Sequence, residues 1–249
     1  MAFTRTHTHR RWPHGLQHFI SVPLGEWALS TFMFAGVVAA LTLVPLGTDV
    51  GPSLAALLVF GTGAVIAGRA LQLGYPHAHL GLCNVITLFR LALTAALVAP
   101  LLMASGPSWA VFAIALVALS LDGVDGWFAR RQGYVSRFGA RFDMEVDSLL
   151  ALVLALGAAI SGGVGPLAIL LGLPRYAFAL GAWRLSWMRR DLPERQSRKT
   201  VCVIQLGVLI ALQAPIVPWG LAVVLVAVAS GALVWSFARD LIWLWRRRG

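Results

Sequence analysis

Four acidic side chains stand out in a chain whose other residues are mostly apolar: Asp122, Asp125, Asp143 and Asp147. Charged groups in a membrane segment are costly, so they are candidates for function by default. On a helix, residues three or four apart share one face. The first two aspartates are three apart, the last two are four apart, and a short basic loop separates the pairs. We therefore expect two antiparallel helices whose acidic faces meet in one small volume.

These carboxylates are the ligand type that hard divalent cations prefer. Four like charges in a medium of low dielectric constant cannot all stay ionised without a partner. Oxygen ligands suit Mg²⁺, Mn²⁺ or Ca²⁺, and two such ions close together form a clamp for phosphoryl displacement. Gly126 and Gly139 leave space on the same two faces, and Arg130 can fork onto a phosphate. The pattern predicts a metal-assisted diphosphate site.

An alternative interpretation is a set of buried aspartate–arginine pairs that only fasten helices together. Buried ion pairs of this kind are weak stabilisers of a fold. They also do not require glycines on the acidic faces. A diphosphate site therefore explains more of the pattern than fastening does.

The composition places this site in an integral membrane protein. Of the 249 residues, 59% are hydrophobic and 12% are charged, and the mean hydropathy is +0.79. A soluble domain carries about 25% charged residues. The formal net charge is +10, but the arginines are spread over the ends of apolar segments instead of forming one patch. That distribution disfavours a nucleic-acid-binding protein and is typical of membrane anchoring.

The apolar segments predict an all-α fold with about eight transmembrane helices. A spanning helix needs about 20 mostly apolar residues. The predicted spans are residues 26–47, 53–73, 82–104, 108–130, 141–162, 166–188, 201–217 and 219–244. Residues 1–25 are expected to form a cytosolic N-terminal tail, for which an interfacial helix and a loose segment are both compatible with the sequence.

The basic residues predict the orientation of these spans. The loops after the first, third, fifth and seventh spans contain no Lys or Arg. The N-terminus, the loops after the fourth and sixth spans and the C-terminus each contain several. Because positively charged loops stay in the cytoplasm, both termini and the acidic site are expected on the cytoplasmic side. The sequence thus predicts a multi-pass protein of the cell inner membrane.

The acidic stretch resembles the signature of the CDP-alcohol phosphotransferases, also called CDP-alcohol phosphatidyltransferases. It reads Asp122-x-x-Asp125-Gly126-x-x-Ala129-Arg130, then eight residues, then Gly139-x-x-x-Asp143-x-x-x-Asp147. All the signature positions match in residue type and spacing. The resemblance implies a catalytic core of six transmembrane helices, here residues 82–245, preceded by two extra transmembrane helices in residues 26–75.

The resemblance also implies a reaction. A phosphatidyl group passes from CDP-diacylglycerol to a hydroxyl of a small polar alcohol, and CMP is released, as a step of phospholipid biosynthesis. Two ions, Mg²⁺ or Mn²⁺, would be held by Asp122, Asp125 and Asp143, and Asp147 would be the general base that also contacts a metal. The residues implied for the CDP pocket are Gly126, Ala129, Arg130 and Gly139. Family members are commonly homodimers, and a homodimer is expected here.

The segment CNVITLFR at the start of the first core helix extends the resemblance. Members often carry an Asn, Thr and Arg pattern there, and this chain supplies Asn84, Thr87 and Arg90. The resemblance implies that these three residues contribute to the CDP pocket. Ordinary helix capping, with Arg90 snorkelling to the membrane interface, is the alternative.

Basic residues near the cytoplasmic ends of the spans are candidates for binding the acceptor: Arg137, Arg175, Arg195, Arg198 and Lys199. Such a cluster could hold an acceptor phosphate. Basic residues beside a membrane also set topology and contact anionic lipids, and the sequence supports both interpretations equally. Arg175 lies deep in the sixth span and needs either a partner or a wet cavity.

Other functions stay open from the sequence alone. A hydrolase would use the same donor with water as the acceptor. A metal-ion or solute transporter would use the carboxylates as an ion path, although the acids gather at one end of the spans. A catalytically silent scaffold would not need an intact signature.

Overall fold

The computed structural model describes residues 23–161, 163–189 and 196–246. Within these residues the chain forms helices and no strands. The helices are α1 Leu24–Leu43, α2 Val50–Gly74, α3 Gly81–Ala96, α4 Val98–Leu102, α5 Trp109–Gln132, α6 Arg137–Ile160, α7 Ile169–Gly172, α8 Pro174–Arg184, α9 Gln196–Ala211 and α10 Trp219–Arg246. Short 3-10 helices, Gly165–Ala168 and Ser186–Arg189, precede α7 and follow α8. Most of the predicted N-terminal tail, residues 1–22, lies outside the described residues.

The helices confirm an all-α integral membrane protein. In the part of the chain that the structure describes, five helical stretches are long and apolar enough to cross a membrane: α1, α2, α3 with α4, most of α5, and α10. A sixth is reached if the bent pair around α7 and α8 is one span. The count of eight stays a prediction, because α6 carries the acidic residues and the apolar part of α9, Thr200–Ala211, is short.

The predicted span over residues 166–188 is not one straight helix. Gly165–Gly172 and Pro174–Arg184 meet at an angle of 56°. Proline lacks the N–H that would continue the hydrogen-bond ladder, so Pro174 begins a new helix instead of extending the previous one. The predicted span over these residues is therefore bent, and a single crossing stays a prediction here because α8 is only 11 residues long.

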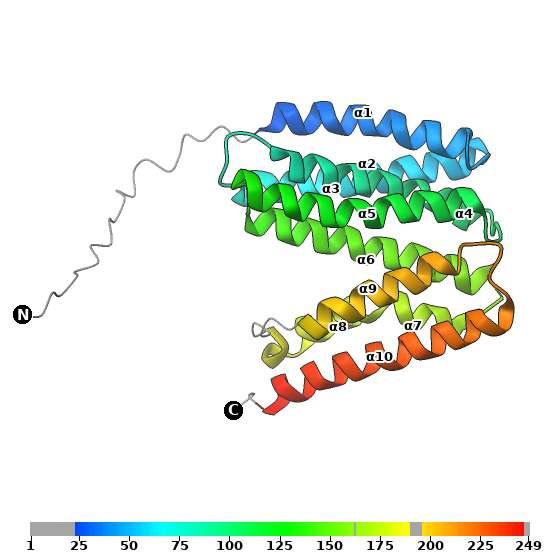
Figure 1. The fold of residues 1–249 in the computed structure, drawn as a ribbon. Coiled ribbons are helices and arrows are strands. Elements are labelled where there is room, and N and C mark those ends of the chain that lie inside the picture. Colours follow the sequence, from blue (N-terminus) through cyan, green and yellow to red (C-terminus); the bar gives the residue numbers. More distant parts are fainter. Residues whose placement is uncertain (1–22, 162, 190–195, 247–249) are drawn as a thin grey trace, which may run out of the picture.

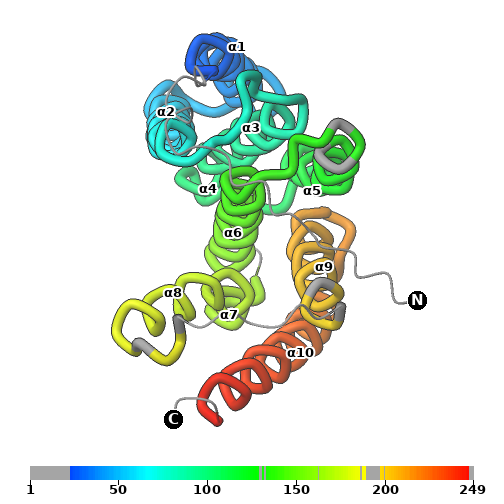
Figure 2. Tube along the Cα trace, turned by 90° about the vertical axis from the view of Figure 1, so that its left-hand side faces the viewer, coloured from blue at the N-terminus to red at the C-terminus, as the bar shows by residue number. Residues whose placement is uncertain are grey.

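The long helices lie side by side, and α6 lies between two groups of them (Figures 1 and 2). The helices α1 to α5 are on one side of α6, and α7 to α10 are on the other. Two apolar cores reflect this arrangement. Phe142 and Val146 of α6 belong to the core shared with α1, α2 and α3, whereas Leu150 and Leu154 belong to the core shared with α5, α9 and α10. The two helices outside the predicted catalytic core therefore share a core with the acidic helix.

The short connection between α5 and α6 turns the chain back, and both helices then pack against α3. Gly133 follows the end of α5 with φ +72°, a left-handed conformation that glycine adopts without strain and that commonly ends a helix. Ser136 then caps α6, because its Oγ accepts a hydrogen bond from the N–H of Gly139 at 3.0 Å. The end of α5 and the start of α6 are thereby defined, and the two helices are joined through their packing on α3 more than through contacts with each other.

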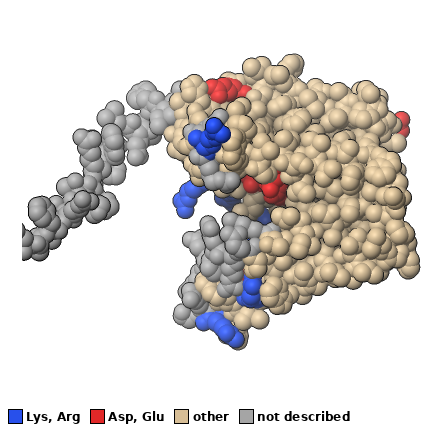
Figure 3. Space-filling view, viewed as in Figure 1, with Lys and Arg blue, Asp and Glu red and all other residues tan. Residues whose placement is uncertain are grey.

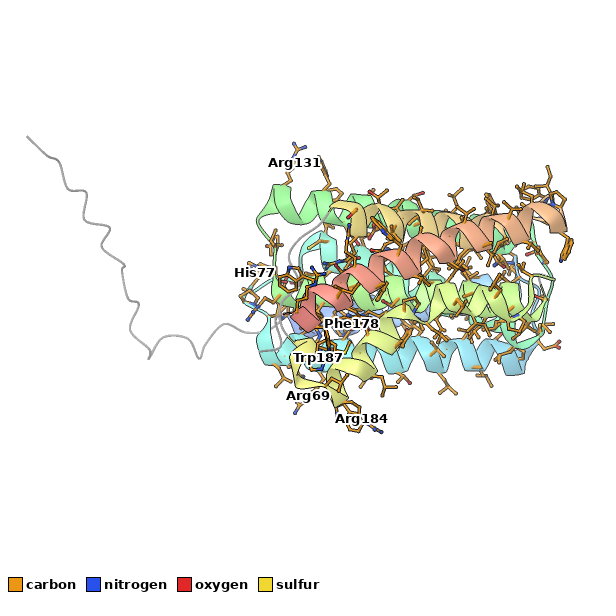
Figure 4. All side chains as sticks on the ribbon, turned by 90° about the horizontal axis from the view of Figure 1, so that it is seen from below. Arg69, His77, Arg131, Phe178, Arg184 and Trp187 are labelled. Carbon is orange, nitrogen blue, oxygen red and sulfur yellow. The ribbon has the colours of Figure 1, made fainter. Side chains whose placement is uncertain are left out.

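Basic side chains gather at one end of the bundle. Arg69, Arg131 and Arg184, from three different helices, lie at the same end as His77 in Figure 4. In the view of Figure 3, lysine and arginine atoms appear only at this end, which is also where the α5–α6 connection lies. The spacing of basic residues along the sequence thus corresponds to a real asymmetry of the folded chain.

Candidate active site

The four aspartates of the signature converge on one side chain, Arg90 of α3. Its guanidinium lies 3.1 Å from a carboxylate oxygen of Asp122 and 2.9 Å from one of Asp125, both on α5. It also donates hydrogen bonds to Asp143 and Asp147 on α6. The side chain of Arg90 is 1% exposed, so the cation is buried among the acids. Three helices therefore meet at one charged centre in an otherwise apolar bundle.

Two further hydrogen bonds hold Arg90 and Asp125 in place. Nε of Arg90 donates to the carbonyl of Ala118 at 3.1 Å. Thr87, one turn before Arg90, donates from its hydroxyl to Asp125 at 3.1 Å. Asp125 is 5% exposed and accepts from both Thr87 and Arg90. It is the most enclosed of the four carboxylates, and its orientation is set from two sides.

The other three carboxylates face an accessible space. The side chains of Asp122, Asp143 and Asp147 are 34%, 35% and 31% exposed. One oxygen from each can be chosen so that all lie within 4.8 Å of one another. Figure 3 shows acidic atoms on this face, close to a hollow at the basic end. Open carboxylates packed this closely repel one another unless a cation or proton joins them.

The charges at the centre favour a bound cation. Four ionised carboxylates against one guanidinium, 4 − 1, leave three negative charges. An arginine stays protonated at any physiological pH, so it supplies only one of the charges needed. The remaining donors are all carboxylate oxygens, which suit Mg²⁺ or Mn²⁺. The residues present therefore fit the divalent metal that the sequence predicted.

The structure brings Asn84 and Gly139, two residues predicted for the CDP pocket, into contact. A Cβ added at Gly139 would lie 3.1 Å from Oδ1 of Asn84, so the missing side chain is what allows α6 to approach α3. The space expected for a ligand at Gly139 is thus partly occupied by Asn84. Gly126 is half-buried on α5. The side chains of Ala129 and Arg130 lie outside the described part of the chain.

The described acceptor candidates lie on three different helices, and two of them have an acidic partner. Arg137 is exposed at the first turn of α6. Arg175 of α8 has a partner, because it donates to Glu145 of α6. Arg198 of α9 lies 2.9 Å from Asp240 of α10. Arg195 and the side chain of Lys199 lie outside the described residues.

Glu145 and Asp240 were missed by the sequence prediction. Glu145 lies between the two aspartates of α6, and its offset of two residues turns it away from Arg90 and towards α8. Asp240 is 7% exposed and belongs to a long apolar helix. An acid inside an apolar span is a signal that could have identified it.

Residues 80–235 match the family CDP-alcohol phosphatidyltransferase. The chain belongs to this family. Membership confirms the resemblance found in the signature, and it supports phosphatidyl transfer from a CDP-alcohol in phospholipid synthesis. The matched residues contain the whole charged centre, whereas α1 and α2 precede them. No curated protein and no solved structure matched the chain.

Proposed function

We propose that the protein transfers a phosphatidyl group from CDP-diacylglycerol to a hydroxyl of a small polar alcohol. The acceptor oxygen forms a bond to the phosphorus that carries the diacylglycerol, the bond from that phosphorus to the CMP oxygen breaks, and CMP leaves. The observation that carries the proposal is the grouping of Asp122, Asp143 and Asp147 within 4.8 Å at an accessible face. Family membership supplies the class of donor.

Asp147 is the general base in this proposal. It lies at the accessible side of the cluster, where a hydroxyl could approach, and it takes the hydroxyl proton as the new P–O bond forms. Asp122, Asp125, Asp143 and Asp147 are the proposed metal ligands. Two divalent ions there, Mg²⁺ or Mn²⁺, would neutralise the diphosphate oxygens and the departing CMP.

Arg90 has an electrostatic role in the proposed site. Its guanidinium contacts all four carboxylates and is buried, so it holds them at a fixed separation. The hydroxyl of Thr87 donates a hydrogen bond to Asp125 and so fixes the orientation of that carboxylate. A preorganised set of ligands needs little rearrangement when charge develops during the reaction, and this is how active sites gain most from electrostatics.

The acceptor end is assigned as in the sequence prediction, and the donor end keeps the predicted residues except Thr87 and Arg90, which are proposed to hold the carboxylates that they contact. The cytidine diphosphate is proposed to lie near Asn84, Gly126 and Gly139, with Ala129 and Arg130 beside it. Basic residues at the ends of α6, α8 and α9 are proposed to face the acceptor. With the basic end in the cytoplasm, the site opens on the cytoplasmic face of the cell inner membrane. A homodimer is proposed as the working form.

An acceptor screen tests this function. Purified protein is mixed with CDP-diacylglycerol and Mg²⁺ or Mn²⁺, and CMP is measured with glycerol phosphate, inositol, inositol phosphate, serine or choline. We expect CMP release that requires one of these alcohols and stops when EDTA removes the metal. Equal release without any alcohol would identify a hydrolase instead. Metal-ion uptake into liposomes with no CMP release in any mixture would identify a transporter.

A further inference from the structure

Tyr75 joins the end of α2 to a residue of the proposed CDP pocket. Its hydroxyl accepts a hydrogen bond from Nδ2 of Asn84 at 3.0 Å and lies 2.6 Å from the carbonyl oxygen of Leu80, to which it donates. The residue is 6% exposed. Burial raises the pKa of Tyr75 to about 12, so the hydroxyl keeps the proton that this pair of bonds requires.

The orientation of the Asn84 amide follows from these contacts. Its NH₂ group points to Tyr75 and also donates to the carbonyl of Leu80 at 2.6 Å. Its oxygen therefore points the other way, towards Gly139 of the signature on α6. Without the Tyr75 hydroxyl, one of the two acceptors that hold the NH₂ group would be lost. The amide would then have more freedom where it contacts Gly139 of α6.

Trp27 makes a second connection, from α1 to the turn of α6 that contains Gly139. Its ring meets Phe138 edge-on with centroids 6.2 Å apart, and Phe142 with centroids 5.6 Å apart. Its Nε1 donates to the carbonyl of Ala64 in α2 at 3.2 Å. Tyr75 also packs edge-on against Phe138, at 5.7 Å. The two phenylalanines directly precede Gly139 and Asp143, so α1 and α2 contact the turn that carries the signature.

We propose that α1 and α2 are a built-in support for the nucleotide end of the site, and that Tyr75 is a positioning residue that acts through Asn84. Both helices, and Tyr75 itself, precede residues 80–235, so family membership assigns them no role. The inference rests on the proposed function, because it takes the ligand near Asn84 to be the cytidine diphosphate of the donor. It predicts an effect on the donor and not on the acceptor.

Steady-state kinetics of Tyr75→Phe test the inference. CDP-diacylglycerol is varied at saturating acceptor, the acceptor is then varied at saturating donor, and CMP is added as a product inhibitor. Loss of one hydrogen bond to a positioned amide should raise the KM for CDP-diacylglycerol and the inhibition constant of CMP about three- to tenfold. The KM for the acceptor should stay at the wild-type value, and the melting temperature should fall only slightly, because the lost hydroxyl also donates to the carbonyls of His79 and Leu80.

Tyr134→Phe is the matched control. The ring of Tyr134 lies 5.0 Å from that of His77, which in turn lies 5.3 Å from the ring of Tyr75. The hydroxyl of Tyr134 makes no hydrogen bond among the described residues. It should leave both KM values unchanged. An Asn84→Ala variant completes a double-mutant cycle with Tyr75→Phe. If Tyr75 acts through Asn84, the double variant should be no worse for the donor than Asn84→Ala alone.

The outcomes separate this inference from the proposed function. If the wild-type protein releases no CMP from CDP-diacylglycerol with any acceptor, the proposed function itself fails. If the wild type is active and Tyr75→Phe keeps the wild-type KM for the donor, Tyr75 is not a positioning residue. A variant with a lower melting temperature and equal losses for donor and acceptor would show a purely structural role and would also overturn the inference.

Discussion

The guanidinium of Arg90 on α3 and the carboxylate of Asp125 on α5 meet at 2.9 Å, with 1% and 5% of their side chains exposed. A buried pair of this kind contributes little net stability, but removing one partner leaves an uncompensated charge. Here the consequence is larger, because the same guanidinium contacts three further carboxylates. Arg90 therefore decides whether the acids can stay close together without a metal.

Replacing Arg90 should make the fold depend on a divalent cation. In Arg90→Met four carboxylates lose their only buried cation among the described residues, at a cost of about 3–5 kcal/mol in unfolding free energy. Added Mn²⁺ should then raise the melting temperature of the variant more than that of the wild type, measured in detergent with Mn²⁺ against EDTA. Arg69→Met is the control, because Arg69 is exposed and its hydrogen-bond partner within the described ranges is Gln72. An equal Mn²⁺ effect in both variants would contradict this role.

Asp147→Asn should abolish turnover while leaving the protein folded. Asparagine keeps the shape but cannot accept the hydroxyl proton, and general-base catalysis contributes about a hundredfold or more. The measurement is CMP release together with the melting temperature and the elution profile in detergent. Asp49→Asn is the matched control, since Asp49 is an exposed residue before α2 whose side chain makes no cap hydrogen bond. Activity of Asp147→Asn within tenfold of wild type would rule out Asp147 as the base.

Gly139→Ala should weaken donor binding without unfolding the protein. The added Cβ would lie 3.1 Å from Oδ1 of Asn84 and 3.2 Å from Oγ of Ser136, so one of these groups must move by a few tenths of an ångström. Alanine also favours helix formation by about 1 kcal/mol over glycine, which offsets part of that cost. We expect a higher KM for CDP-diacylglycerol at a nearly unchanged melting temperature.

Gly61→Ala on α2 is the control for this substitution. A Cβ at Gly61 would meet nothing within 4 Å, so the helix preference of alanine acts alone there. The control should gain up to about 1 kcal/mol of stability and keep the wild-type KM. Unchanged donor KM in both glycine variants would show that the α3–α6 approach at Gly139 does not affect the pocket.

Asp240→Asn should lower stability and reveal how Arg198 is held. Arg198 of α9 lies 2.9 Å from Asp240, and the acid is 7% exposed. Weakening a charge-assisted contact of this type costs about 1–3 kcal/mol. The melting temperature of the variant should fall. If Arg198 binds a phosphate of the acceptor, the KM for the acceptor should also rise. Arg246→Ala, at the exposed end of α10, should change neither quantity. A normal melting temperature in Asp240→Asn would contradict the structural role of this pair.

Much of the site could be predicted from the sequence because it depends on local periodicity. Spacings of three and four residues place Asp122 with Asp125, and Asp143 with Asp147, on single helix faces whatever the rest of the fold does. The short connection between the two helices returns the second acidic pair to the same end of the bundle, where both helices pack on α3. The approximate ranges of the helices followed in the same way from apolar length. The bend before Pro174 was missed, because the apolar composition continues through it.

The contacts made by residues far apart in the chain could not be predicted in this way. Arg90 lies 35 residues before Asp125 and 57 before Asp147, and its segment indicated a residue of the CDP pocket but not the centre of the four carboxylates. The link from Tyr75 to Asn84 and the packing of Trp27 on Phe142 likewise arise only when α1 and α2 pack against α3 and α6.

The sequence by itself determined that this is a helical membrane protein with a carboxylate site of its family, because composition and short-range spacing are properties of the chain. Only the tertiary structure decided that a buried arginine is at the centre of that site and that residues from α1 and the end of α2 contact Asn84 and the first turns of α6. The physical reason is that the packing of helices determines which side chains from distant segments share one low-dielectric volume. A pattern of apolar residues every three to four positions shows which face of a helix is buried, but not which other helix that face contacts.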